Sequence, residues 1–585
     1  MKNRKQRRRN IIAVTVFALF LASLYFILSG GLADMRRGMG PPVILEIDLE
    51  GGFPEIAEDS PLHLLRRPPV TLRDLVDSID HAARDPNVAA LIARVGNSPN
   101  GLARIQEIRD ALLRFRESGK PAIAWSMTFG ELEPGNASYY LATAFDEIHL
   151  QPSGEVAFTG LRAEIPFAGE LVNKLGIEVE GDTREEYKSV FYLYTESELP
   201  DFQRDAEQQL LDNIFGQLVR SVAVGRDTDE ATVREWVARA PLLAPAAFEH
   251  GLVDSLRHRD QVYRELRGRF PVQPEIVGLS TYAKDHLTRP DTGPVVALIT
   301  GDGAVLRGRS NRNFITGSRV MGADSIVDAF ERAIDDSDVR VIVYRITSPG
   351  GSVVASEAIW RMVQRAREAG KPVVVSMGDV AASGGYYIAM GADRIVAQPG
   401  TVTGSIGVVL SRFLTEDMWS KLGITWDAVQ SGPNADWFSS LSSHSPEQWA
   451  QFQERLDFYY DVFVERTAEG RGLSLDEARS AAKGRVWSGE QALELGLVDA
   501  LGGLDIALDL ARDLAEVEPD APVRVVPYPR PRTLIQRLLG RDATGASTVP
   551  VELIRILRSL YGLAGQAGLV ERPAGYTYDN PERNW

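Results

Sequence analysis

The chain has 585 residues, of which 44% are hydrophobic and 25% are charged, and these proportions are typical of a globular protein with several domains. Its formal net charge of −16 argues against a nucleic-acid-binding protein, because such proteins gather positive charge. The absence of cysteine excludes thiol catalysis, thiolate metal sites and disulfide bonds.

The N-terminal segment predicts a membrane anchor. Six basic residues within the first nine precede an uncharged run of eighteen residues, from Ile11 to Leu28. This run is just long enough to span a bilayer, and it exceeds the usual apolar region of a cleavable signal peptide, which is the alternative. We therefore expect residues 1–40 to form a basic cytoplasmic tail and one transmembrane helix, with the rest of the chain across the membrane.

Two similar halves follow, and each contains the same landmarks in the same order. Both begin with a buried-strand run, PVILEIDLEGG from Pro42 and PVVALITGDGA from Pro294. A second strand then ends in SPNG or SPGG, an amphipathic helix closes on Gly-Lys-Pro, and a third strand precedes YYLA or YYIA, QP, KLGI and GLVD. Corresponding landmarks lie about 250 residues apart, which indicates an internal duplication.

Strands and helices alternate in each half, so right-handed βαβ crossovers and a mainly parallel sheet are expected. The predicted fold class is therefore α/β, with the βαβ domain present twice. We assign residues 41–285 to the first repeat, residues 286–520 to the second repeat, and residues 521–585 to a Pro-rich tail with short amphipathic helices. Docking of this tail on the body is favoured over contact with the membrane.

In the second repeat, the stretch GDVAASGGYYIAM places Ser383 between two alanines and two glycines. A buried strand, Pro372 to Met377, precedes it and a helix start follows, so Ser383 is expected at a strand-to-helix turn. The N-terminus of a helix favours negative charge, which suits a nucleophilic hydroxyl and an oxyanion. The alternative is that the small residues only let the helix pack close to the strand.

A second turn in the same repeat, SPGG from Ser348 to Gly351, offers a bare Gly-Gly pair after a strand. Such a turn lets backbone N–H groups face a substrate oxygen. The first repeat has SPNG there, with a side chain in place of one glycine. A plain turn is the alternative, but a position about thirty residues before the ASGG turn favours an oxyanion hole.

The candidate base comes from the other repeat. Asn136 stands opposite Ser383, so the first repeat has no nucleophile there, and none of the seven histidines lies in a landmark segment. The first repeat has Lys188 a dozen or so residues after KLGI, where the second has Ala435. Burial can leave a lysine amine neutral enough to accept a proton. These complementary losses predict one shared site in which Lys188 reaches Ser383, while the alternative for Lys188 is a solvated surface lysine.

These residues resemble the signal peptide peptidase A family, membrane-anchored Ser-Lys peptidases of the long, duplicated form. The resemblance extends from the N-terminal segment to roughly residue 515. The family's fold is similar to that of the Clp peptidases and crotonases. The motifs that carry the resemblance are TSPGGSVVASE from Thr347, VSMGDVAASGGYYIA from Val375, TVTGSIGV from Thr401, and YKS from Tyr187.

The resemblance implies a role for each matching residue. Ser383 is expected as the nucleophile and Lys188 as the general base. The backbone N–H groups of Gly351 and Gly384 are expected to form the oxyanion hole. Ser405, in TGSIG, matches the serine whose hydroxyl orients the lysine amine in this family, and a plain turn serine is the alternative there.

The function expected from these residues and the resemblance is a membrane-bound serine endopeptidase that degrades cleaved signal peptides and similar apolar peptides. It is expected to be a homo-oligomer, a tetramer, that contacts lipid through the N-terminal helix and binds no nucleic acid. The expected location is an inner (cytoplasmic) membrane of bacterial type, with the catalytic body on the periplasmic side. No metal or cofactor is expected, since the sequence has no metal-ligand cluster, Walker loop or dinucleotide fingerprint.

The sequence also departs from the family pattern. Glu185 and Glu186 precede Lys188, where family members tend to have a glycine, and two carboxylates would favour the protonated amine if they faced it. Two other functions stay open. One is a crotonase-type acyl-thioester enzyme, which shares the fold but needs no serine nucleophile. The other is a catalytically inactive, membrane-tethered scaffold.

Overall fold

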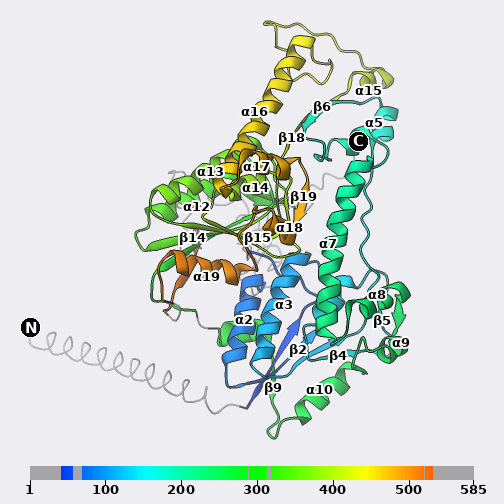
Figure 1. Ribbon diagram of the computed structural model, residues 1–585, viewed down its shortest axis with the longest axis vertical. Coiled ribbons are helices and arrows are strands. Elements are labelled where there is room, and N and C mark those ends of the chain that lie inside the picture. Colours follow the sequence, from blue (N-terminus) through cyan, green and yellow to red (C-terminus); the bar gives the residue numbers. More distant parts are fainter. Residues whose placement is uncertain (1–40, 57–68, 288, 313–317, 519–520, 531–585) are drawn as a thin grey trace, which may run out of the picture. The chain divides into compact units, whose positions relative to one another are not determined.

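The computed structural model (Figure 1) describes residues 41–56, 69–287, 289–312, 318–518 and 521–530. The predicted anchor, Ile11 to Leu28, and nearly all of the predicted tail lie outside these ranges. Within the ranges given, no helix has the length and apolar character needed to cross a membrane. The elements described below all belong to one compact unit, which ends at Tyr528.

The first repeat is built on a six-stranded sheet with the order β8-β4-β3-β2-β1-β9, and every neighbouring pair of strands in it is parallel. The inner strands are short runs of Val, Ile, Leu and Ala that are almost entirely buried, as in parallel sheets covered on both faces. The strands are β1 (Val43–Asp48), β2 (Val88–Arg94), β3 (Ala122–Ser126), β4 (Glu147–Leu150), β8 (Ser255–Leu256) and β9 (Glu275–Gly278).

The second repeat has the same arrangement. The order β21-β10-β14-β15-β16-β20 matches β9-β1-β2-β3-β4-β8, and all of these pairs are parallel, so the predicted duplication of an α/β unit is confirmed. The edge strand β21 comes from the segment expected as tail. The strands are β10 (Val295–Asp302), β14 (Val339–Ser348), β15 (Val373–Ala382), β16 (Arg394–Ala397), β20 (Ala500–Leu501) and β21 (Arg524–Tyr528).

Helices cover both faces of each sheet, and their buried side chains form separate hydrophobic clusters with the two strand faces. In each repeat two longer helices pack on one face and a shorter helix packs on the other. These helices are α2 (Leu72–Arg84), α3 (Leu102–Glu117) and α10 (Arg259–Gly268) in the first repeat, and α12 (Ala323–Asp335), α13 (Val353–Glu368) and α19 (Leu504–Leu514) in the second.

The other described helices lie at the strand ends or beyond the sheets. In the first repeat they are α4 (Asn136–Ala142), α5 (Gly169–Leu175), α6 (Tyr192–Thr195), α7 (Asp201–Gly225), α8 (Glu230–Arg239), α9 (Ala244–Glu249) and α11 (Leu279–Asp285). In the second they are α14 (Gly384–Ala389), α15 (Glu416–Lys421), α16 (Pro446–Arg471), α17 (Leu475–Ala482) and α18 (Gly489–Glu494).

Shorter strands complete each repeat. In the first repeat, β5 (Glu155–Val156) and β7 (Leu242–Leu243) form an antiparallel pair. In the second repeat, β17 (Val402–Gly404) extends the sheet beside β15 and pairs antiparallel with β19 (Val486–Ser488). A separate small sheet contains β11 (Ala304–Leu306), β12 (Asn311–Arg312) and β13 (Arg319–Gly322).

One strand pair joins the two repeats directly. The first-repeat strand β6 (Glu178–Arg184) runs antiparallel to the second-repeat strand β18 (Val408–Leu414) over seven residue pairs. Strand β6 ends four residues before Lys188, and β18 begins three residues after Ser405. The pairing therefore brings the chain segments of the candidate base and the candidate orienting serine to the same place.

Candidate functional site

Ser383 lies between the last residue of β15 and the first residue of α14, at the expected strand-to-helix turn. Its φ of +54° lies in the left-handed region, which few residues other than glycine adopt. The turn is held because the Ser383 N–H donates to the Gly404 carbonyl oxygen (2.8 Å) and the Ser383 carbonyl accepts from the Tyr387 N–H (2.8 Å). These two hydrogen bonds hold Ser383 in an unusual backbone conformation.

The glycines after Ser383 are also required by packing. A Cβ atom on Gly384 would lie 2.5 Å from Ser356 Oγ, and one on Gly385 would lie 2.8 Å from the Ser348 carbonyl oxygen. The close approach of helix and strand that stood as the alternative explanation of this stretch is therefore present as well. It does not compete with a chemical role, because both need the same small residues.

Lys188 is buried, with 5% of its surface exposed, so the solvated-surface alternative for this residue is wrong. Its Nζ lies within hydrogen-bond distance of Ser383 Oγ (3.0 Å), Ser405 Oγ (2.9 Å) and the Ser405 carbonyl oxygen (2.8 Å). Burial lowers the pKa of Lys188 to about 7, because the charged ammonium loses its hydration. The side chain that the first repeat contributes thus meets the serine of the second repeat as an amine that can be neutral near pH 7.

The two glutamates before Lys188 are bound elsewhere. Glu186 Oε1 lies 3.8 Å from Lys483 Nζ, and Glu185 is hydrogen-bonded to Tyr460, whose pKa is raised by burial and by this carboxylate. Burial is the cause of the Lys188 pKa shift. Carboxylates that faced Lys188 would favour its protonated form, but these two bind Lys483 and Tyr460 instead.

A tight turn of the second repeat positions the backbone of Lys188, and sequence reasoning did not single it out. Gly484 has φ +79°, and a Cβ atom there would lie 2.7 Å from Lys188 N. On either side of it, the Lys483 carbonyl accepts from Tyr187 N–H (3.1 Å) and the Arg485 carbonyl accepts from Ser405 N–H (2.7 Å). The available signal was a glycine between two basic residues directly before a strand.

Gly351 and Gly384 approach each other at the mouth of the site. A Cβ atom on Gly384 would lie 3.1 Å from Gly351 N, and one on Gly350 would lie 2.7 Å from Gly384 N and 2.8 Å from Ser383 Cβ. Gly350 has φ +99° and Gly351 has φ +150°, which favour glycine. Two backbone amides therefore lie next to the serine, in a turn that leaves no space for side chains.

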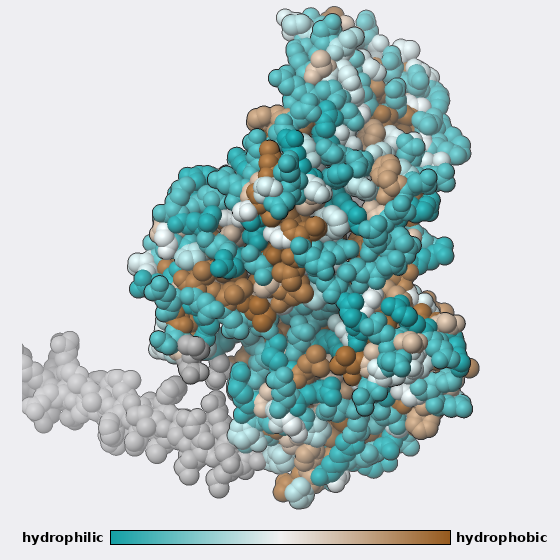
Figure 2. Space-filling view, in the orientation of Figure 1, coloured by the Kyte–Doolittle hydropathy of each residue, from teal (hydrophilic) through white to brown (hydrophobic). Residues whose placement is uncertain are grey.

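A pocket of about 80 Å³ opens beside Ser383. Lys188, Gly351 and Gly384 line it, and no histidine is among its described lining residues. In Figure 2, hydrophobic residues gather in the middle of the visible face, where Figure 1 labels β14 and β15. The remaining walls of the pocket are mainly apolar and consist of Val353, Ser356, Tyr387, Gly407, Val408, Val409, Tyr459 and Phe463.

The corresponding place in the first repeat is filled. The Asn136 side chain donates through Nδ2 to the Gly160 carbonyl (2.7 Å) and accepts through Oδ1 from the Gly160 N–H (3.1 Å). Gly160 (φ +89°) precedes Leu161 as Gly404 (φ +77°) precedes Ser405, so this repeat also lacks the second serine. Among the described residues, only the second repeat has an available serine at this turn.

Comparison with known proteins identifies relatives of this chain. The model of peptidase family S49 matches it twice, over residues 114–272 and 365–518. The chain is 31% identical to Protease 4 of Salmonella typhi over 77% of its own length and 72% of that protein. It is 29% identical to the chloroplastic serine protease SPPA of Arabidopsis thaliana, covering 86% of this chain and 73% of that one.

Protease 4 of Haemophilus influenzae is also similar, with 29% identity over 77% of this chain and 74% of that one. The two family matches cover more than half of the chain, and one includes Lys188 while the other includes Ser383 and Ser405. The chain therefore belongs to peptidase family S49, within the signal peptide peptidase A group, and is a serine protease.

Proposed function

We propose that this serine protease is a membrane-anchored endopeptidase with a Ser-Lys dyad shared between the repeats at residues 41–285 and 286–520. The observation that carries the proposal is the 3.0 Å distance between Lys188 Nζ and Ser383 Oγ in an environment that lowers the lysine pKa to about 7. A nucleophile within hydrogen-bond reach of a base with such a pKa meets the requirements for activation at neutral pH.

Ser405 is the proposed orienting residue. Its carbonyl oxygen can only accept, and its hydroxyl can also accept, so the two hydrogens of a neutral Lys188 amine have a partner each. The nitrogen lone pair is then left for the hydroxyl hydrogen of Ser383. This arrangement supports a base that is both neutral and correctly turned.

In the proposed reaction, Lys188 takes the proton of Ser383 while Ser383 Oγ attacks the peptide carbonyl carbon. The N–H groups of Gly351 and Gly384 stabilise the oxyanion. Protonated Lys188 then gives its proton to the leaving amine as the peptide bond breaks. A water molecule, deprotonated by the same amine, attacks the acyl-enzyme ester. As the bond between the acyl carbon and Ser383 Oγ breaks, the Lys188 ammonium returns the proton to Oγ, and the acid product leaves.

The proposed substrates are cleaved signal peptides and similar apolar peptides. The apolar walls that Val353, Val408 and Phe463 give the pocket support this choice, as does similarity to the signal peptide peptidase A group. Anchoring by residues 11–28 in an inner membrane, a periplasmic body and a tetrameric assembly complete the proposal. These three features rest on the sequence pattern and on the family resemblance.

Labelling of the full-length protein by a serine-directed fluorophosphonate tests the dyad. Peptide mapping is expected to place the label on Ser383, at a rate that rises with pH around 7 and falls strongly in Lys188→Met. Lys174→Met, which changes an exposed lysine of the same repeat, is the control and is expected to label as wild type does.

If the rate of labelling at Ser383 does not change in Lys188→Met, the assignment of Ser383 as nucleophile stands and the assignment of Lys188 as base is wrong. An unlabelled Ser383 would remove the nucleophile and favour a crotonase-type or inactive protein. Cleavage of a fluorogenic apolar peptide in the same preparations tests the proposed substrate class.

A further inference from the structure

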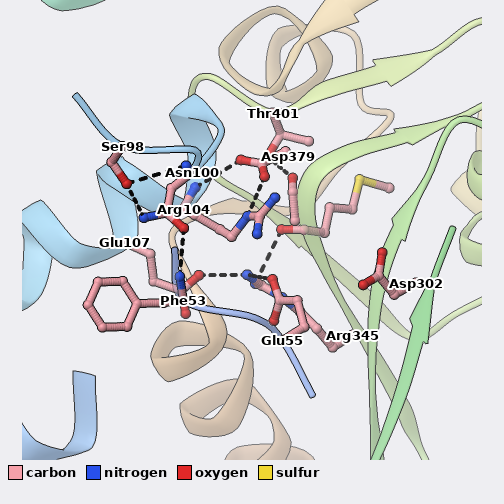
Figure 3. Close-up of polar contacts among 12 residues, drawn as sticks. Phe53, Glu55, Ser98, Asn100, Arg104, Glu107, Asp302, Arg345, Asp379 and Thr401 are labelled. Atoms are coloured by element: carbon pink, nitrogen blue, oxygen red, sulfur yellow. Dashed lines mark hydrogen bonds and ion pairs between the residues drawn. The ribbon is translucent and has the colours of Figure 1, made fainter. Parts of the chain in front are cut away.

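Helix α3 of the first repeat contacts three second-repeat segments that lead to the proposed site residues. Figure 3 shows two of these contacts, Arg104 with Asp379 and Glu107 with Arg345. Arg104 binds Asp379 on β15, four residues before Ser383. Gln106 Oε1 accepts from the Gly400 N–H (2.7 Å), five residues before Ser405. Glu107 pairs with Arg345 on β14 (2.8 Å), six residues before Gly351. About one turn of a single helix thus meets the segments that carry the proposed nucleophile, the proposed orienting serine and the proposed oxyanion turn.

Asp379 caps α3 from the opposite repeat. In the second repeat, the side chain of Ser352 caps α13 by accepting from the Ala355 N–H. The matching residue of the first repeat is Leu102, which has no polar side chain and is already the first residue of α3. Gly101 provides no side-chain cap.

The Asp379 carboxylate accepts from the Arg104 backbone N–H (3.1 Å) and from its guanidinium. A Cβ atom on Gly101 would collide with that carboxylate. A negative charge at a helix N-terminus is stabilised by the free N–H groups and by the helix dipole. The carboxylate of Asp379 on β15 therefore replaces the side-chain cap that α3 lacks in its own repeat.

Arg345 forms the second connection and is deeply buried, with 2% exposure of its side chain. It lies between Glu107 and Glu55 of the first repeat, whose side chains are 3% and 7% exposed. It also donates to Ser376 Oγ (2.8 Å) on the neighbouring strand β15. Removing one member of such a buried cluster is costly, so the cluster allows one register between α3 and the two strands.

The contacts matter for the chemistry because Lys188 and Ser383 come from different repeats. The distance between Nζ and Oγ depends on how the repeats dock, and errors of about 1 Å can cost about 10²-fold in rate. We propose that α3 is a positioning element for the shared site, and that Arg104, Gln106 and Glu107 set the places of Ser383, Ser405 and Gly351 through Asp379, Gly400 and Arg345. This inference rests on the proposed function of Lys188 and Ser383.

The test uses the full-length protein and the fluorogenic peptide, with kcat and KM measured separately. Asp379→Ala removes both bonds to Arg104 and is expected to lower kcat about tenfold with KM changed less than about twofold, because the reacting groups shift while the substrate pocket remains. Asp379→Asn keeps an acceptor for the Arg104 N–H and is expected to recover part of the loss. Arg104→Ala keeps the helix cap and is expected to lie between Asp379→Ala and wild type.

Asp393→Ala is the matched control. Asp393 also accepts from one backbone N–H, that of Val373 (2.8 Å), and from one guanidinium, that of Arg367 (2.9 Å), but all three groups belong to the second repeat. This variant is expected to lower the unfolding temperature as Asp379→Ala does and to keep the wild-type kcat.

A kcat within twofold of wild type in Asp379→Ala, or an equal loss of kcat in Asp393→Ala, would overturn the positioning role. If Asp379→Ala does not fold, Asp379→Asn and Arg104→Ala decide by the same criterion. A wild-type protein that neither cleaves the peptide nor labels at Ser383 would overturn the proposed function and this inference together. An active wild type with unaffected Asp379 variants would overturn this inference alone.

Discussion

The two repeats have sheets of the same topology with the same turns, but different side chains follow the third strand of each sheet. In the second repeat, Ser383 Oγ is within hydrogen-bond distance of Lys188 Nζ, and Ser383 lines a pocket. In the first repeat the Asn136 amide binds both backbone groups of Gly160. A repeat can lose its reactive side chain and keep its fold when the replacement satisfies the polar groups around it. In the proposed site, the first repeat supplies the lysine instead of the serine.

The largest effect should come from exchanging the residues at this turn. Ser383→Ala is expected to lower kcat by at least about 10³-fold, because no other group can form the acyl-enzyme. Asn136→Ala removes the equivalent side chain and is expected to leave kcat within twofold of wild type while lowering the unfolding temperature, since Gly160 loses its two partners. Peptide hydrolysis and thermal unfolding measure both. Equal losses of kcat would mean that both turns take part in catalysis.

Lys188→Met should have the next largest effect, a fall of about 10²- to 10⁴-fold in kcat, as for loss of a general base. Wild-type activity is expected to rise with pH around 7, because the amine must lose its proton and burial lowers its pKa to about 7. The residual activity of Lys188→Met should lack this rise. A pH profile of kcat checks the difference, and an unchanged rise in the variant would assign the titration to another group.

The proposed oxyanion turn, Ser348 to Gly351, gives a third comparison. Gly350→Ala places a Cβ atom 2.7 Å from Gly384 N, and the displaced donor is expected to cost about 10²- to 10³-fold in kcat. Asn100→Gly, at the matching turn of the first repeat, removes an amide bound to Phe53 N–H and the Gly51 carbonyl. It should lower stability by about 1–3 kcal/mol and leave kcat unchanged. Denaturant unfolding and hydrolysis separate the two, and a kcat loss in Asn100→Gly would contradict a silent first-repeat turn.

Ser405→Ala should have a smaller effect, a loss of about tenfold in kcat, because the amine keeps the Ser405 carbonyl and loses one hydrogen bond. Leu161→Ser introduces the missing hydroxyl into the first repeat and is expected to leave kcat as in wild type, since Lys188 contacts Ser405 of the second repeat. Steady-state hydrolysis measures both variants. A wild-type kcat in Ser405→Ala would mean that Ser405 is an ordinary turn serine.

The last prediction concerns stability and leaves the rate aside. Because burial lowers the Lys188 pKa from 10.5 to about 7, the unfolded chain binds one more proton than the folded chain between those pH values. The free energy of unfolding therefore rises with pH in that window, by up to about 1.4 kcal/mol per pH unit from this group. In Lys188→Met the contribution vanishes. Denaturant unfolding of both proteins at pH 7 and 9 checks it, and parallel pH dependences would contradict a depressed pKa.

Much of the fold could be predicted from the sequence, because the patterns that decide it are local. Apolar β-branched runs, glycine turns and amphipathic helices recur in one order, so the α/β class and the duplication followed before any coordinate was known. The strand β21 was missed, since its short sequence RVVPY contains a proline and lies in a Pro-rich segment. It is an edge strand, where proline is tolerated.

For the site, the sequence by itself determined which residues were candidates. Aligning the two repeats is enough to see that the first has Lys188 without a matching serine and the second has Ser383 without a matching lysine. The tertiary structure decided how these residues meet: the burial of Lys188, the partners of Glu185 and Glu186, the support from Gly484, and the contacts of α3 with Asp379 and Arg345. The physical reason is that burial, pKa and hydrogen-bond geometry depend on atoms brought together from distant parts of the chain, whereas helices, strands and turns follow from neighbouring residues.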